Sequence, residues 1–201
     1  MASDHYFTSS PGSELRLRPL EVTLAGEPRA LQTAGGIFNP DGIDAGTAIL
    51  LDAVPAPPAV GDLLDVGCGW GPLTLTLALL SPDARVWAVD VNERALDLVR
   101  LNAERLGMAN VTAALPHEVP ADIRFAAIWS NPPIRVGKDT LHEILETWLP
   151  RLDDGADAHL VVAKHLGADS LQRWLGETLP GDFTVERTAN TRGYRVIRVT
   201  R

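Results

Sequence analysis

Residues 62 to 81 read DLLDVGCGWGPLTLTLALLS, and this stretch decides the fold class. A short apolar run, 62–67, ends in a loop with glycines at positions 67, 69 and 71. A second apolar run begins at Pro72, and proline is favoured in the first turn of a helix. We therefore expect a strand over 62–67, a tight glycine loop, and a helix over 72–81, which is the repeating unit of a parallel sheet.

The rest of the chain repeats this alternation of strand and helix. Short apolar runs bounded by turn residues predict strands, and apolar residues at helical spacing predict helices. Strands are predicted over 85–90, 111–115, 124–130, 159–165, 183–191 and 193–201, and helices over 92–107, 138–152 and 168–179. Alternating units imply an α/β fold with a mainly parallel sheet covered on both faces, and the final strand pair adds an antiparallel member.

Residues 1–43 precede this alternation. Residues 15–34 alternate polar and apolar side chains around a turn, which predicts a short β-hairpin. A loop rich in Gly, Asn, Pro and Asp follows, and Asp44 stands where an N-cap would start a helix through residues 47–54. We expect a single domain over 1–201, composed of a hairpin and loop extension (1–43) and a core (44–201).

Composition limits the class of protein. The chain has 201 residues, of which 45% are hydrophobic and 22% charged, as in ordinary globular proteins. No apolar run approaches the roughly 20 residues that span a bilayer, and residues 1–10 lack the pattern of a secretory signal. The lone Cys68 excludes an internal disulfide, and the five histidines show no metal-ligand spacing. We expect a cytoplasmic protein with no metal and no membrane partner; the oligomeric state stays open, with a monomer favoured.

The charge pattern decides little about partners. The net charge of −8 counts against a large non-specific nucleic-acid footprint. All basic residues except Lys138 and Lys164 are arginines, which suit planar, bidentate contacts with phosphates and bases. A GC-rich genome would explain the same excess of arginine.

The glycine loop and the acids around it predict a nucleoside ligand without phosphate. Pro72 stands where a dinucleotide fingerprint requires a third Gly or Ala, and the loop lacks the Lys and hydroxyl of a P-loop. Asp65 adds an acid that suits a cationic ligand better than a pyrophosphate. Asp90 ends the second strand, where an acid accepts the hydroxyls of a ribose; capping the next helix is the alternative. S-adenosylmethionine, a nucleoside that carries a sulfonium, fits these features.

Three motifs, DVGCGWG (65–71), AVDVNERAL (88–96) and SNPPIRVGK (130–138), resemble the class I S-adenosylmethionine-dependent methyltransferases. More narrowly, they resemble the small-domain group that methylates the exocyclic N2 of guanine in ribosomal RNA of the 16S type. HYFTSSP, GIFNPDGIDAGTAILL and GYRVIRV are less specific similarities. The resemblance implies a Rossmann-like sheet of seven strands in the order 3-2-1-4-5-7-6, with strand 7 antiparallel. Residues 44–201 would be the catalytic core, with the site at the carboxyl ends of strands 1, 2 and 4.

The NPP motif would fix one asparagine at the end of a buried strand, because two successive prolines restrict the backbone. An aromatic amine is a poor nucleophile, since its lone pair is delocalised into the ring. The Asn131 side-chain oxygen and the Pro132 carbonyl would accept its two N–H groups and stabilise the positive charge that grows during transfer. Asn131, Pro132 and Pro133 are therefore the predicted catalytic residues, acting by alignment without a strong base or metal. A Pro-Pro turn that merely ends a strand is the alternative.

The resemblance also implies which residues contact the cofactor. The predicted cofactor-binding residues are Thr47, Asp65, Gly67, Cys68, Gly69, Gly71, Asp90, Val91 and Asn131. Asp44 and Gly46 would lie near the methionine end of the cofactor, although a plain helix cap explains Asp44 equally well. His117 or Glu118 would contact the adenine amine, and Cys68 would be a small filler in the loop.

The predicted substrate-binding residues are Phe38, Ile134, Arg135 and Lys138. Many relatives have Phe or Tyr after the second proline, where the ring stacks on the target base. Ile134 occupies that position here, which counts against an adenine or glutamine target. Stacking on the base would then be weaker or come from Trp70 or Phe38. Arg135 and Lys138 would meet RNA phosphate or be solvated loop charges.

The leading hypothesis is an S-adenosylmethionine-dependent N-methyltransferase acting on a guanine N2, with ribosomal RNA or the small ribosomal subunit as partner. Methylation of a protein glutamine or a small-molecule amine is one alternative. A non-catalytic cofactor-binding module of ribosome assembly is another. Trp87, Trp148 and Trp174 lie on apolar faces and are predicted to be core residues.

Overall fold

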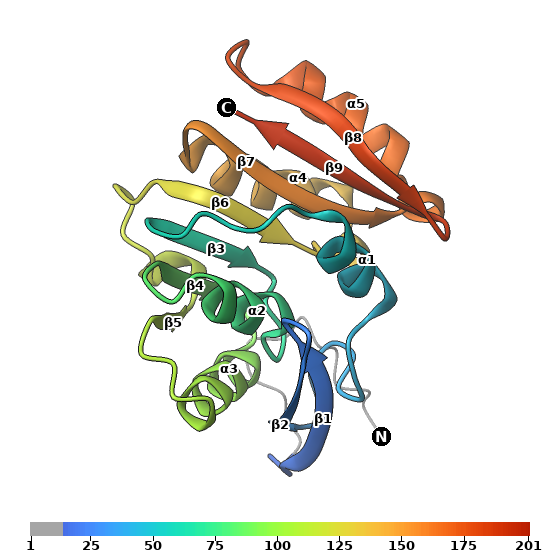
Figure 1. Ribbon diagram of the computed structural model, residues 1–201. Helices are drawn as coiled ribbons and strands as arrows, with labels where there is room; N and C mark the ends of the chain where they lie inside the picture. The colour runs from blue at the N-terminus through green and yellow to red at the C-terminus, as the bar shows by residue number, and fades with distance from the viewer. Residues whose placement is uncertain (1–13) are drawn as a thin grey trace.

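A computed structural model describes residues 14–201 and contains a two-stranded hairpin beside a seven-stranded sheet (Figure 1). The predicted similarity over HYFTSSP lies outside the described residues. The strands are β1 (Arg18–Leu24), β2 (Glu27–Thr33), β3 (Asp62–Val66), β4 (Arg85–Val89), β5 (Val111–Ala114), β6 (Phe125–Ser130), β7 (Leu152–Ala163), β8 (Thr184–Thr191) and β9 (Tyr194–Thr200). The helices are α1 (Ala45–Ala53), α2 (Pro72–Leu80), α3 (Glu93–Arg105), α4 (Lys138–Trp148) and α5 (Ala168–Thr178). Four 3-10 turns are η1 (Pro116–Glu118), η2 (Ile134–Val136), η3 (Leu149–Arg151) and η4 (Lys164–Leu166).

The strand order of the large sheet confirms the predicted fold class. The order β5-β4-β3-β6-β7-β9-β8 is the predicted 3-2-1-4-5-7-6. Neighbours from β5 to β7 pair in parallel, and β9 pairs antiparallel with both β7 and β8. Helices α1, α2 and α3 lie on one face of the sheet, and α4 and α5 lie on the other (Figure 1). No helix among residues 14–201 is long and apolar enough to cross a membrane.

Two predicted boundaries around β7 are wrong. The helix predicted over 138–152 ends at Trp148, and Pro150, which has no N–H, lies in a 3-10 turn instead. The strand predicted to begin at residue 159 begins at Leu152. Its polar first half was assigned to no element, but Gly155 donates to the Arg201 carbonyl at 2.6 Å. Backbone pairing that a hydrophobic pattern cannot reveal therefore extends this strand.

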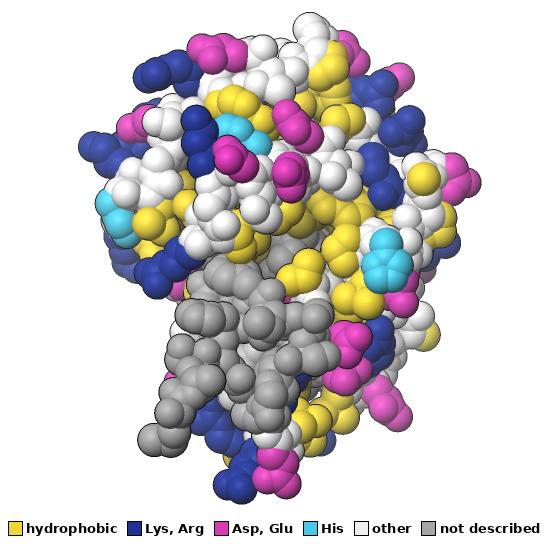
Figure 2. Space-filling view, turned by 180° about the vertical axis from the view of Figure 1, so that it is seen from behind, with side chains coloured by type: hydrophobic (Ala, Val, Ile, Leu, Met, Phe, Trp, Pro, Cys, Tyr) yellow, Lys and Arg dark blue, Asp and Glu magenta, His cyan; other side chains and the backbone are white. Residues whose placement is uncertain are grey.

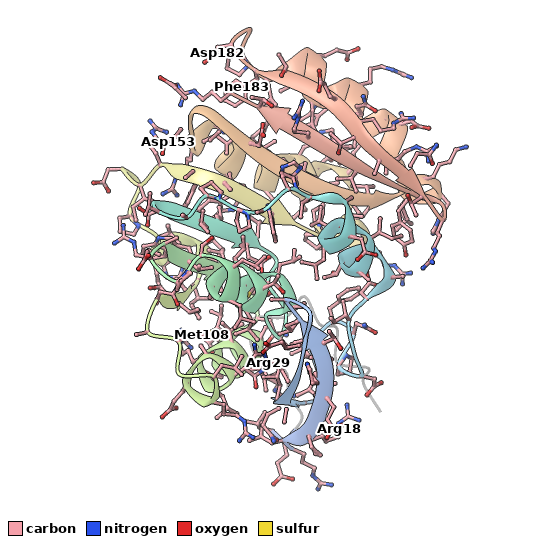
Figure 3. The ribbon with its side chains drawn as sticks, in the orientation of Figure 1. Arg18, Arg29, Met108, Asp153, Asp182 and Phe183 are labelled. Carbon is pink, nitrogen blue, oxygen red and sulfur yellow. The ribbon has the colours of Figure 1, made fainter. Side chains whose placement is uncertain are left out.

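Apolar side chains fill both sides of the sheet. On the side of α4 and α5, Trp148 is 3% exposed, and Trp87 and Trp174 contact the same core, which confirms the prediction for all three tryptophans. The acidic side chains Asp153 and Asp182 lie at the end of the sheet from which β3 and β6 start (Figure 3). The carboxyl ends of the parallel strands thus lie at the opposite end of the sheet from these two acidic side chains.

The hairpin is attached to α2 and α3 by apolar contacts and by one asparagine. The apolar cluster between them contains Leu20, Leu24, Leu31, Ala34, Ile37, Trp70, Leu75, Ala95, Leu98 and Ala103. The side chain of Asn102, which is fully buried on α3, accepts from the Gln32 N–H at 2.8 Å and donates to the Gln32 carbonyl at 2.9 Å. Arg29 and Met108 lie in the region where the hairpin meets the α2–α3 side of the molecule (Figure 3).

The loop after the hairpin is attached to the start of α3 in the same way. The Asn92 side chain donates to the Gly36 carbonyl at 2.8 Å, and the Arg94 guanidinium donates to the Gly35 carbonyl at 2.8 Å. Buried donors of this kind are costly to leave unpaired, so the loop position is well determined. The loop that leads to α1 is therefore fixed beside the carboxyl ends of β3 and β4.

We predict that Asn102→Ala lowers the free energy of unfolding by about 2–4 kcal/mol, because it leaves both buried polar groups of Gln32 unpaired. Urea unfolding measures the loss, and hydrogen exchange at the Gln32 amide should accelerate. Glu104→Ala, an exposed change on the same helix, is the matched control. Unfolding curves of Asn102→Ala that match those of the wild type would show that this contact does not hold the hairpin.

Candidate active site

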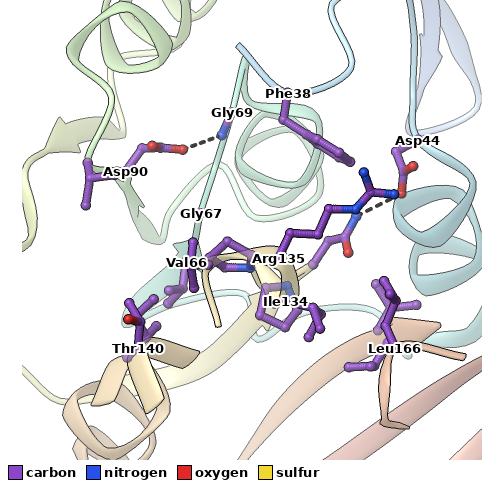
Figure 4. A pocket seen from close by; sticks show the side chains of 18 of the residues that line it. Phe38, Asp44, Val66, Gly67, Gly69, Asp90, Ile134, Arg135, Thr140 and Leu166 are labelled. Carbon is purple, nitrogen blue, oxygen red and sulfur yellow. Dashed lines mark hydrogen bonds between the residues drawn. The ribbon is translucent and has the colours of Figure 1, made fainter. Parts of the chain in front are cut away.

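The carboxyl ends of β3, β4 and β6 border one cavity of about 570 Å³. Residues of the loop before α1, of η2 and α4, and of the ends of β7 and β9 complete its walls (Figure 4). Seen from behind, hydrophobic side chains gather near the middle of the molecule, with Lys and Arg side chains towards its edges (Figure 2). The cavity lies where the direction of strand order reverses, which is the usual ligand site of an open α/β sheet.

The glycine loop between β3 and α2 depends on left-handed backbone conformations. Gly67, Gly69 and Gly71 have φ values of 76°, 54° and 96°, which side-chain-bearing residues rarely adopt. The N–H groups of Gly67 and Cys68 both donate to the Val89 carbonyl, at 2.8 and 3.1 Å, and this joins the loop to β4. A Cβ on Gly69 would meet nothing within 4 Å, so the loop leaves open space at this point.

Cys68 is an inert filler of this loop. The side chain is buried, and its Sγ lies 3.7 Å from the Gly69 carbonyl. Burial raises the pKa of the Cys68 thiol, and the nearby Asp90 and Asp65 raise it further. A thiol that stays protonated is a poor nucleophile.

Asp90 follows β4 and faces the glycine loop. Its Oδ2 accepts from the Gly69 N–H at 3.0 Å (Figure 4). Its Oδ1 accepts from the Asn92 N–H at 2.9 Å. Burial raises the pKa of Asp90, whereas the backbone hydrogen bonds oppose that shift. Each carboxylate oxygen has further lone pairs, so the side chain can still accept from two hydroxyl groups of a ligand. Val91 is 45% exposed and lies beside it on the cavity wall.

Asp65 lies behind the glycine loop rather than on the large cavity. It is 1% exposed, and one oxygen accepts from the N–H and the hydroxyl of Thr74, at 2.9 and 2.6 Å. Its other oxygen has no hydrogen-bond partner among residues 14–201, and the residue lines a second cavity of about 30 Å³. Burial raises the pKa of Asp65 to about 7, since the Thr74 contacts only partly compensate for the lost solvation.

The NPP segment is fixed to β3 and folded into a tight turn. Ser130 is fully buried and its hydroxyl donates to the Val66 carbonyl at 2.7 Å, which ties the end of β6 to the end of β3. Pro133 has φ −75° and ψ 73°, and the Ile134 N–H donates to the Pro132 carbonyl at 2.8 Å. These values describe an inverse γ-turn. The Pro132 carbonyl keeps one lone pair for a ligand in a fixed direction.

The Asn131 amide is oriented by α1. Its Nδ2 donates to Asp44 Oδ2 at 2.9 Å and to Thr47 Oγ1 at 3.1 Å. Because an ionised carboxylate can only accept, the NH2 group must point to Asp44, and the amide oxygen points away from it. The Asn131 oxygen is therefore left to accept from a ligand.

Gly46 lets α1 approach this closely. A Cβ on Gly46 would lie 3.0 Å from both Asp44 Oδ2 and Tyr194 Cε1, and 3.4 Å from Asn131 Nδ2. A side chain here would force these groups apart, so glycine is required by contact rather than by its φ angle. Asp44 also caps α1, since its Oδ2 accepts from the N–H groups of Gly46 and Thr47, which confirms the predicted N-cap.

The structure places the predicted site residues in three locations. The large cavity is lined by Phe38, Gly67, Gly69, Asp90, Val91, Asn131, Pro132, Pro133, Ile134 and Arg135. The small cavity behind the loop is lined by Thr47, Asp65 and Cys68. Gly71 and Lys138 line neither cavity; Gly71 caps α2, and Lys138 is exposed at the start of α4.

Three side chains considered for ligand contacts lie elsewhere. Trp70 is 2% exposed and donates to the carbonyls of Asn39 and Gly42, so it cannot stack on a base. It supports instead the loop that carries Phe38, which is 43% exposed and faces the cavity (Figure 4). Glu118 accepts from the Leu115 N–H, and neither it nor His117 lines the cavity, where Pro116 stands instead.

From the sequence, no role at the site was predicted for Ser130, Tyr194 or His165. Tyr194 begins the antiparallel strand β9, and such a strand starts at the carboxyl edge of its parallel neighbours. From this position at the start of an antiparallel strand, Tyr194 could have been predicted to lie near the site. His165 lies in η4 after β7, where a strand was predicted to continue. Nothing in the sequence marks Ser130 as the link between two strands.

We predict that the contribution of Asp65 to the stability of the free protein falls as pH rises from about 4.5 to about 6.5. The folded state holds a proton on Asp65 up to about pH 7, whereas the unfolded chain loses it near 3.8, so the folded state binds more protons in this window. Asp65→Asn removes this effect and keeps an acceptor for Thr74. The difference in unfolding free energy between wild type and variant should change by up to about 1.4 kcal/mol per pH unit. Parallel pH profiles in denaturant titrations would contradict the raised pKa.

Comparison with known proteins identifies the family. The methyltransferase small domain family matches residues 29–198. The Bacillus subtilis (strain 168) protein YbxB is 33% identical over 199 residues, which covers 98% of each chain. Ribosomal RNA small subunit methyltransferase C of Salmonella choleraesuis (strain SC-B67) is 30% identical over 171 residues, which covers 83% of this chain and 49% of that enzyme. The chain thus spans about half the length of the ribosomal RNA methyltransferases that it matches.

Solved structures share the fold. The T. thermophilus 16S rRNA N2 methyltransferase RsmC, in complex with AdoMet and guanosine, superposes with a TM-score of 0.78 at 24% identity, over 95% of this chain and 52% of that chain. SMU.1697c from Streptococcus mutans, in complex with SAH, gives a TM-score of 0.57 at 21% identity, over 79% of this chain and 98% of that chain. The chain belongs to the methyltransferase small domain family of S-adenosylmethionine-dependent methyltransferases.

Proposed function

We propose that this protein methylates the exocyclic N2 of a guanine in 16S-type ribosomal RNA. One observation carries the proposal: the Asn131 amide is held by Asp44 and Thr47 so that its oxygen, together with the Pro132 carbonyl, can accept from an incoming NH2 group. Two fixed acceptors side by side suit an amine and would repel a carbonyl or a phosphate.

The residues around the glycine loop fit S-adenosylmethionine. Asp90 retains lone pairs for the ribose hydroxyls, Val91 offers an apolar surface for the adenine, and the space at Gly69 is open. The buried, unpaired oxygen of Asp65 favours a positive charge nearby, as an ammonium or a sulfonium would supply. When bound, the cofactor supplies an activated methyl group on sulfur.

The protein's own contribution is orientation and charge stabilisation. The Asn131 oxygen and the Pro132 carbonyl each accept one N–H of the target amine, which draws the nitrogen towards tetrahedral geometry and withdraws its lone pair from conjugation with the ring. The same two acceptors stabilise the positive charge that develops on the nitrogen, and they do so without rearrangement because the γ-turn and α1 already hold them. Apolar walls from Ile134 and Leu166 exclude water from the reacting groups.

Similarity and surface charge support RNA as the substrate. The Salmonella relative is named as a ribosomal RNA methyltransferase, and the T. thermophilus structure contains guanosine. Arg135 lines the cavity, Lys164 lies next to the cavity residue His165, and the Lys164 N–H donates to the Gly193 carbonyl beside Arg192. Within residues 14–201, these three cations form no salt bridge, although the net charge is −8. They are available to RNA phosphate.

The test is methyl transfer from radiolabelled S-adenosylmethionine to ribosomal RNA from cells that lack this protein, followed by nucleoside analysis. We expect N2-methylguanosine at a single mapped position of the small-subunit RNA. Label in N6-methyladenosine, in protein, or in no RNA nucleoside would refute the proposal.

We predict that Asp90→Ala weakens S-adenosylmethionine binding at least about tenfold, because it removes a charged acceptor worth about 1.5–3 kcal/mol. Isothermal titration of the purified protein measures the change. Asp83→Ala, an exposed position with the same change in charge, should bind like the wild type. Equal affinities of Asp90→Ala and wild type would remove Asp90 from the cofactor site.

We predict that Asn131→Ala lowers kcat about a hundredfold, the usual effect of removing one fixed transition-state contact. Cofactor affinity should change less than about threefold, because the acceptor acts on the target amine. Single-turnover transfer to ribosomal RNA and cofactor titration separate the two effects. A variant with normal turnover would show that Asn131 only ends a strand.

A further inference from the structure

One oxygen of the Asp44 carboxylate makes no hydrogen bond within residues 14–201, and the Asp44 side chain lines the large cavity. Its Oδ2 accepts from Gly46 N, Thr47 N and Asn131 Nδ2, at 2.8, 3.4 and 2.9 Å. Its Oδ1 accepts from no group within the described part of the chain, and it is not buried away from solvent. The side chain lines the large cavity on the side opposite to Asp90 (Figure 4).

The second oxygen lies next to the catalytic amide. A helix cap needs only one acceptor atom, and Ser, Thr or Asn supplies it as well as Asp does. The contact through Oδ2 places the whole carboxylate beside Asn131, and Gly46 allows Tyr194 to close the other side. Asn131 and Asp44 line the same cavity, so a ligand whose amine reaches the Asn131 oxygen lies in a space that the Asp44 carboxylate also borders.

We propose that Asp44 Oδ1 accepts the N1–H of the target guanine and selects guanine over other amines; this inference rests on the proposed function. In guanine, a ring N1–H donor stands next to the 2-amino group, so an acceptor-only carboxylate beside the amine site is satisfied. In adenine, the ring N1 next to the 6-amino group is an acceptor, and its lone pair would face the carboxylate. A site built to bond one ring proton rejects a base that lacks it.

The test compares guanine with 2-aminopurine, which lacks the N1–H and also the 6-oxo group; variants of Asp44 then assign the preference to N1. 2-Aminopurine carries the same 2-amino group as guanine, but its N1 is an unprotonated acceptor. Once the modified position is mapped, the RNA fragment is made with guanine or with 2-aminopurine there, and kcat/KM for methyl transfer is measured for both. The wild-type protein should prefer guanine by about tenfold or more, since a hydrogen bond to a charged group is lost and two acceptors are opposed.

Asp44→Asn should reverse or abolish that preference. The asparagine oxygen must take over the contacts of Oδ2, because those partners are all donors, and its NH2 then faces the base. Asp44→Ser keeps a cap without the second oxygen and should lower the preference without reversing it. Asp52→Asn, an exposed change on the same helix with the same loss of charge, should behave like the wild type.

The outcomes separate this proposal from the proposed function. An unchanged preference in Asp44→Asn would overturn the role of Asp44 while guanine methylation stands. A loss of S-adenosylmethionine affinity in Asp44→Asn with an unchanged preference would assign Asp44 to the cofactor site and also overturn it. A wild-type protein that methylates no guanine in ribosomal RNA would refute the proposed function first, and the role of Asp44 with it.

Discussion

The hydrogen bonds from the Asn131 amide to Asp44 and Thr47 are the contact on which the site depends. They join the end of β6 to the start of α1, two segments that are more than 80 residues apart in the chain. The amide would otherwise rotate about its terminal torsion, because an asparagine side chain has a broad preference there. With the NH2 group held, the oxygen keeps one direction, and the γ-turn at Pro133 fixes the second acceptor beside it. Rigidity at this point is built from side-chain partners as well as from prolines.

The same contact explains features that otherwise look unrelated. Gly46 must lack a side chain so that α1 can come within reach, and Ser130 must be buried so that β6 and β3 end together. The hairpin and the loop after it position the start of α1, and Asn92, Arg94 and Asn102 hold them against α3. The N-terminal segment therefore forms part of the wall of the site, through Phe38 and Asp44.

Much of this could be predicted from the sequence, because the strongest patterns are local. The alternation of strands and helices predicted a mainly parallel sheet with helices on both faces. The resemblance of the glycine loop, the strand-end acid Asp90 and the NPP motif to a known family implied the strand order and the edge where the site lies. Features that depend on partners distant in the chain could not be predicted. The polar start of β7 pairs with the backbone of Arg201, and Trp70 is buried in the hairpin cluster and donates to the Asn39 carbonyl. Asp65 was predicted to face the loop and bind the cofactor, but no sequence pattern predicted that Thr74 would occupy one of its oxygens behind the loop.

The antiparallel strand β9 has a consequence for the order in which the site becomes complete. This strand inserts between β7 and β8, and Tyr194 at its start contacts the region of Gly46 and lines the cavity. A growing polypeptide that has left the ribosome only as far as β8 would already possess the glycine loop and the NPP segment, but it would lack this wall. Such a nascent chain should be able to order its central strands and still lack one wall of the cavity, so the site becomes complete only after β9 has left the ribosome.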